Sequence, residues 1–118
     1  PNATVPASNI VESSKTGANC VRIYWEVNDG RGIAQLETFM KAAIKNKMFA
    51  MVCLFGNDIT GQRYDKGGFQ RAIDYWKNNA TIFNRHKDYL LLNIANEVGA
   101  ESEDFLGWNK SAITQLRN

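Results

Sequence analysis

Hydrophobic and polar residues follow one another in blocks whose spacing alternates between strand-like and helix-like. The run Cys20–Trp25 is rich in β-branched and aromatic residues, so it predicts a strand. Beyond the turn-forming residues 28–32, apolar side chains recur every three or four positions up to Ile44, which predicts an amphipathic helix. Met48–Phe55 is then a continuous apolar run of strand length, typical of a parallel sheet covered on both faces.

The second half of the chain repeats this alternation. Helical spacing of apolar residues returns over Phe69–Phe83, and Tyr89–Ala95 predicts a third buried strand. Glu103–Asn118 places its apolar residues on one side of a last helix, for which Ser102 can serve as N-cap. Near the start, Ile10–Thr16 is compatible with a helical turn or two.

Strands that alternate with helices predict parallel pairing through right-handed crossovers, hence an α/β fold. Doubly wound nucleotide-binding folds and half of a (β/α)8 barrel share this pattern. The Gly30-Arg31-Gly32 segment lacks the third glycine and the spacing of a phosphate-binding loop, which weakens the nucleotide-binding interpretation. A complete barrel needs at least ~200 residues. The 118 residues therefore predict one domain, residues 1–118, which is too short for a complete barrel.

Composition excludes several classes of protein. A net charge of +2 is too small and too interspersed for a nucleic-acid-binding face. The longest apolar run is far shorter than the ~20 residues of a membrane span, so we expect a soluble domain without a signal peptide. Cys20 and Cys53 are expected to be buried free thiols. The only histidine, His86, lies between two basic residues and is expected to be solvated. No cysteine and histidine spacing suits zinc, so no metal or cofactor is expected.

Candidate chemistry gathers at the predicted strand ends. Glu97 follows Asn96 at the tip of the third strand, where barrel enzymes assemble active sites, although a glutamate there can also simply begin a solvated loop. Arg22 shares a strand face with Tyr24 and Glu26, and a buried guanidinium needs acceptors. Arg22 can therefore orient a carboxylate, or its head group can extend past the strand end into solvent.

Aromatic side chains near these positions can stack on sugar rings or belong to the core. The candidates are Tyr24, Trp25, Tyr64 and Trp108.

Four segments together resemble consecutive landmarks of glycoside hydrolase family five, especially its bacterial β-mannanase branch. They are Gly17–Ile23, Asp58–Gly61, Ala72–Trp76 and Leu92–Glu97. The resemblance implies a retaining hydrolase of β-1,4-linked mannan or glucan built on a (β/α)8 barrel. The family is typically extracellular in microbes, so the resemblance also implies secretion.

The resemblance assigns roles to individual residues. Glu97 matches the general acid/base, and Asn96 matches the partner that binds the sugar 2-hydroxyl. Arg22 matches the arginine that orients the nucleophile. Asn57 stands where the β-mannanase pattern usually has histidine before Asp58, and this departure concerns the substrate subsite.

The resemblance implies that the chain forms a half-barrel, with only the equivalents of strands two to four, and we expect the segment that carries the family nucleophile at strand seven to be absent from this sequence. We therefore expect a homo-oligomer, a dimer or a dimer of dimers, in which Glu97 of one chain and Asp58 of another face one cleft. Glu26 is the competing second carboxylate. Two other hypotheses remain open: a non-catalytic half-barrel that binds carbohydrate, and, less favoured, a nucleotide-binding domain.

Overall fold

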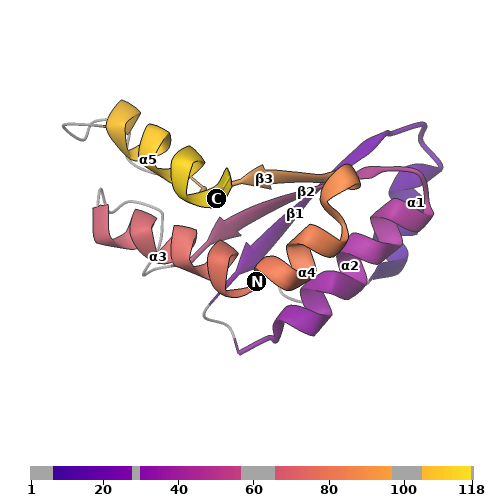
Figure 1. The fold of residues 1–118 in the computed structure, drawn as a ribbon. Helices are drawn as coiled ribbons and strands as arrows, with labels where there is room; N and C mark the ends of the chain where they lie inside the picture. Colours follow the sequence, from indigo (N-terminus) through magenta and orange to yellow (C-terminus); the bar gives the residue numbers. More distant parts are fainter. Residues whose placement is uncertain (1–6, 28–29, 57–65, 97–104, 118) are drawn as a thin grey trace.

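Three parallel strands form a single sheet in the computed structural model, which describes residues 7–27, 30–56, 66–96 and 105–117 (Figure 1). Helices alternate with the strands along the chain, as expected for right-handed crossovers. The elements in order are α1 (Ala7–Ser14), β1 (Cys20–Glu26), α2 (Ile33–Lys45), β2 (Phe49–Phe55), α3 (Lys66–Asn78), α4 (Ala80–Arg85), a 3-10 turn (Lys87–Tyr89), β3 (Leu90–Asn93) and α5 (Phe105–Arg117).

β2 is the central strand, paired with β1 on one side and with β3 on the other. The β1–β2 register runs from Cys20 opposite Phe49 to Glu26 opposite Phe55. The β2–β3 register is shorter and ends with Cys53 opposite Asn93. Because all three strands point the same way, their carboxyl ends lie at one edge of the sheet.

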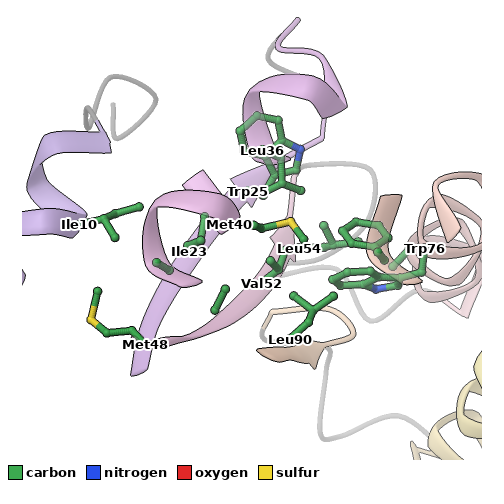
Figure 2. Packing of buried hydrophobic residues seen from close by; sticks show 14 residues of the cluster. Ile10, Ile23, Trp25, Leu36, Met40, Met48, Val52, Leu54, Trp76 and Leu90 are labelled. Carbon is green, nitrogen blue, oxygen red and sulfur yellow. The ribbon is translucent and has the colours of Figure 1, made fainter. Parts of the chain in front are cut away.

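The core lies between one face of this sheet and the helices. Alternate strand residues point toward α2, α3 and α4, because successive side chains of a strand face opposite sides. Leu36 and Met40 of α2 and Trp76 of α3 pack against these strand residues (Figure 2). The strand members of the cluster are Ile23, Trp25, Ala50, Val52, Leu54 and Leu90.

A smaller cluster joins α3 to α5. Phe69 and Ile73 of α3 pack against Ala112 of α5, with the half-buried Trp108 beside them. A pair of side-chain hydrogen bonds between Gln70 and Gln115, at 3.0 and 3.3 Å, accompanies this contact.

The predicted α/β class, the three strands and the alternating helices agree with the structure, but the opposite face of the sheet differs from the expectation. Phe49 and Leu91 are each 43% exposed and Tyr24 is 46% exposed, and all three point away from the helices. Within the described residues the sheet is therefore covered on one face only. We call the uncovered side the open face.

Two element boundaries also differ from the prediction. The helix expected over Phe69–Phe83 begins earlier, at Lys66, and is divided at Asn79. The Asn79 side chain donates to the Tyr75 carbonyl at 2.9 Å, and such local bonding competes with continued helix. β3 ends at Asn93 instead of Ala95, and Tyr89 belongs to the preceding 3-10 turn.

An ionic cluster joins α2 to the end of α4. Glu37 is only 8% exposed, and one of its oxygens accepts hydrogen bonds from Arg85 Nη1 at 2.7 Å and His86 Nε2 at 2.8 Å. The expectation of a solvated His86 was wrong, because its side chain is only 14% exposed and is hydrogen-bonded to Glu37. The hydrogen bond from His86 lowers the pKa of Glu37, burial raises it, and Arg85 lowers it, leaving the pKa below its ordinary value.

A carboxyl whose pKa is depressed by folding stabilises the protein above its unfolded-state pKa, and that stabilisation is lost as the pH falls through the folded value. We expect Glu37→Gln to lower the free energy of unfolding at pH 7 by about 1 to 2 kcal/mol, measured by urea denaturation. The difference from wild type should shrink as the pH falls from about 5 toward 3.

The matched control is Glu12→Gln, because Glu12 forms an exposed ion pair with Lys15 on α1. Its effect should stay within about 0.5 kcal/mol at every pH. A difference between Glu37→Gln and wild type that is equally large at pH 3 and pH 7 would contradict the assigned role of this cluster.

Candidate functional site

The carboxyl edge of the sheet carries polar side chains from β1 and from the segment after β3. Arg22, Tyr24 and Glu26 alternate along β1 and point to the open face, whereas Trp25 points into the core. Glu26 is the last residue of β1 and is half-buried. The open face of β1 therefore carries a cation and an aromatic ring along its length and a carboxylate at its carboxyl end.

Arg22 reaches across β2 to the segment that follows β3. Its Nη2 donates to Asn96 Oδ1 at 3.1 Å and lies 3.3 Å from Cys53 Sγ. The guanidinium carbon also lies 4.4 Å from the centre of the Tyr24 ring, a cation–π distance. Arg22 is exposed on the open face, so the prediction of a buried guanidinium was wrong. The side chain is nevertheless held in place over the sheet.

Asn96 is fixed through its backbone as well as its side chain. Its N–H donates to the Leu54 carbonyl at 2.7 Å, so the chain still follows β2 three residues after β3 has ended. Asn93 joins the same group: with its amide turned to satisfy both atoms, Oδ1 accepts from Arg22 Nη2 at 3.2 Å and Nδ2 donates to the Ala95 carbonyl. Two asparagine amides therefore converge on one guanidinium.

Cys53 of β2 lies next to both Arg22 and Asn96. It is 0% exposed, and its Sγ lies 3.5 Å from Asn96 Oδ1 as well as close to Arg22. Both cysteines are free, as predicted, although Cys20 is half-buried. The sequence indicated a buried thiol at position 53 but not its neighbours. Those neighbours follow from the pairing of β2 with β1, in which Cys53 lies opposite Tyr24, and the sequence pattern does not contain this register.

The structure does not bring all the aromatic candidates to this edge. Trp25 is 0% exposed, its indole Nε1 donates to Tyr75 Oη at 2.9 Å, and the Arg31 guanidinium covers its ring at 4.0 Å. Trp25 therefore belongs to the core and offers no face for a sugar. Trp108 packs near Phe69, with 6.2 Å between ring centres.

Four other candidates, Asn57, Asp58, Tyr64 and Glu97, lie outside the described residues. Glu97 is nevertheless the next residue after Asn96 in the chain. A hollow of about 240 Å³ beside β1 extends the site, and Arg22, Tyr24 and Arg31 line it together with Asn9 and Ser13 of α1. It combines hydrogen-bonding side chains with apolar residues and two aromatic rings, those of Tyr24 and Phe39, a combination that typical ligand pockets use to bind and orient a molecule.

The part of the chain that the structure describes contains neither a metal-binding cluster nor a membrane-spanning helix. No three histidine, cysteine, aspartate or glutamate residues there are grouped so as to hold a metal ion. None of the described helices has the length and apolar character needed to cross a membrane.

The contact between Arg22 and Asn96 can be tested through folding stability. We expect Arg22→Met and Asn96→Ala each to cost about 1 kcal/mol, and the double variant to cost about 0.5 to 1.5 kcal/mol less than their sum. Urea denaturation of all four proteins measures this coupling. Costs that add within about 0.3 kcal/mol would contradict the contact.

Comparison with known proteins gives two relatives. The chain is 33% identical over 90 residues to a mannan endo-1,4-beta-mannosidase of Salipaludibacillus agaradhaerens, covering 71% of this chain and 27% of that relative. It is 28% identical over 116 residues to a mannan endo-1,4-beta-mannosidase of Cellvibrio japonicus, covering 92% of this chain and 26% of that relative. No protein-family model matches. The chain is thus distantly similar to mannosidases and spans about a quarter of the length of each.

Proposed function

We propose that this chain is a glycoside hydrolase related to family five, which cleaves β-1,4-linked mannan or a related glucan at a site that a second copy of the chain completes. Glu97 is the general acid/base, Asn96 binds the sugar beside the scissile bond, and Arg22 orients the reacting groups. Such polysaccharides lie outside cells, so secretion is part of the proposal.

The hydrogen bond between Arg22 and Asn96 is the observation that carries the proposal. It joins β1 to the segment after β3 at the carboxyl edge, and Glu97 is the residue that follows Asn96 in the sequence. A carboxyl group at such an edge, among donors that are already fixed, suits proton donation to a leaving oxygen. The arginine supplies a permanent positive charge that can orient a second carboxylate.

The one-sided sheet supports the assignment of a partial (β/α)8 barrel. In a barrel the helices cover the outer face of the strands and the inner face lines a packed lumen. Trp25, Val52 and Leu54 correspond to the outer face, because they pack against the helices. Arg22 and Cys53 correspond to the lumen, because they lie on the open face.

Glycoside hydrolysis of this type needs a second carboxyl group, about 5 to 5.5 Å from the first in retaining enzymes and ~6.5 to 9.5 Å in inverting ones. Glu26 at the end of β1 and Asp58 after β2 are the candidates within this sequence. Asp58 would supply the second carboxyl group from a neighbouring chain. Glu26 would supply it from the same chain or from a neighbour.

An assembly of two or more copies is the second part of the proposal. Tyr24, Phe49 and Leu91 expose apolar surface on the open face of a parallel sheet, whereas parallel sheets are normally covered on both faces. A second copy would cover this surface and bring a carboxylate toward the first copy's edge. The alternative function is a half-barrel that binds carbohydrate without cleaving it, through the same Arg22 and Asn96 donors.

Hydrolysis of β-1,4-mannan tests the catalytic proposal. We expect the wild-type chain to release manno-oligosaccharides and Glu97→Gln to lose at least about 100-fold in rate, because the general acid contributes that much or more. Glu12→Gln, which changes an exposed glutamate on α1, should keep full activity.

Two results separate the alternatives. Glu97→Gln with undiminished activity would contradict the role of Glu97. A wild-type chain that binds mannotetraose in calorimetry but releases no product would favour the non-catalytic alternative.

Sedimentation velocity tests the assembly. We expect the wild-type chain to sediment as a dimer or larger at micromolar concentration, and Leu91→Lys to sediment as a monomer, because a charge placed on the open face cannot be buried without a partner. Leu106→Lys is the control, since Leu106 is 65% exposed on α5. A compact wild-type monomer would contradict the assembly.

A further inference from the structure

The segment Ala72–Trp76 of α3 stands out in the sequence but has no part in the proposed chemistry. Its last two residues each make a hydrogen bond on one side of the sheet, one to β1 and the other to the segment just after β3. Tyr75 Oη accepts from Trp25 Nε1 of β1 at 2.9 Å, and Trp76 Nε1 donates to the carbonyl of Ile94 at 2.9 Å. One short stretch of helix is thereby bonded toward both sides of the sheet.

Both contacts lie close to the residues of the candidate site. Trp25 directly precedes Glu26, the last residue of β1. Ile94 lies just after β3 and two residues before Asn96. The two hydrogen bonds therefore hold the outer strands from the helix side, and Arg22 bonds to Asn96 across the open face.

Helix geometry explains how adjacent residues serve opposite strands. Successive side chains of an α-helix diverge by about 100°, so Tyr75 and Trp76 leave α3 in different directions. The central strand β2 lies between the two strands that they contact. A helix with only one such side chain would be bonded to one side of the sheet only. We call the two hydrogen bonds, made by Tyr75 and Trp76, the tethers.

The two indole rings that donate these hydrogen bonds are buried. Trp25 is 0% and Trp76 is 2% exposed, and both belong to the core cluster drawn in Figure 2. The Trp76 ring also packs against Phe83 of α4, with 4.6 Å between ring centres. An indole N–H at such a depth requires an acceptor, so each ring has a restricted position relative to its partner.

We propose that Tyr75 and Trp76 are positioning residues that set the span between the carboxyl ends of β1 and β3, and hence the placement of Asn96 relative to Arg22. The proposal extends the assigned glycoside hydrolysis and rests on it for its kinetic consequence. Reactions between positioned groups lose rate steeply with small displacements. Loss of either tether should therefore lower turnover more than substrate affinity.

The test compares three variants in which a side-chain hydrogen bond is removed and most of the packing volume is kept. Trp76→Phe removes the bond to Ile94, and Tyr75→Phe removes the bond to Trp25. The matched control is Gln70→Met, because Gln70 of α3 bonds to Gln115 of α5 rather than to a strand. Kinetics on β-1,4-mannan are measured for each variant beside wild type.

We expect kcat to fall about tenfold in Trp76→Phe and about three- to tenfold in Tyr75→Phe, with KM within about twofold of wild type. Gln70→Met should keep the wild-type kcat. Equal losses in all three variants, or no loss in Trp76→Phe, would overturn the positioning role. Tyr75→Phe differs from wild type only by a hydroxyl. If Trp76→Phe does not fold, the kcat of Tyr75→Phe tests the positioning role on its own.

A second readout separates this proposal from the proposed function. The side-chain amide resonances of Asn96 in NMR spectra should shift in Trp76→Phe and stay unchanged in Gln70→Met. Unshifted resonances in Trp76→Phe would overturn the positioning role even in an active enzyme. A wild-type chain that hydrolyses no mannan but shows the expected shifts would contradict the proposed function and support the tether.

Discussion

Parallel pairing of β1 and β3 on the two sides of β2 is the constraint on which the rest of the structure depends. It places Glu26 and the segment leading to Asn96 at the same edge of the sheet, although they are far apart in the sequence. It also divides the residues of each strand into two sets. One set is buried by the helices, and the other includes Arg22, Tyr24 and Cys53.

The site depends on support from both faces. On the open face, Arg22 spans β2 and meets Asn96 above the buried Cys53. On the helix face, Trp76 holds the carbonyl of Ile94. β3 is short, but the Asn96 N–H still donates to the Leu54 carbonyl of β2. This hydrogen bond fixes the position of the segment that follows β3.

The strands and helices could be predicted because their apolar residues follow simple periods. Cys20–Glu26 and Ile33–Lys45 appear in the structure nearly as the pattern indicates. The break at Asn79 was not predicted, because it depends on a side chain that bonds to the backbone of the preceding turn. The early end of β3 was not predicted either, since apolar periodicity cannot show where pairing with a neighbouring strand stops.

The site could be predicted only in outline. Arg22 and Asn96 were identified from the sequence, but a one-dimensional pattern does not show which of the two bonds to the other. The sequence left Trp25 open between sugar stacking and the core, and the structure places it in the core, against the helices. His86 was expected to be solvated, but Glu37, which is remote in sequence, binds it. Such outcomes are set by contacts between distant segments, which local spacing does not contain.

In the proposed function, Arg22 and Asn96 contact a bound β-1,4-linked sugar chain. An NMR titration of the wild-type chain with mannotetraose tests it most directly. We expect the largest shifts at the Arg22 Nε–H and the Asn96 side-chain amide, while the Gln70 and Gln115 amides stay unchanged. Saturating shifts confined to the α3–α5 contact, or no saturable shifts at all, would contradict it.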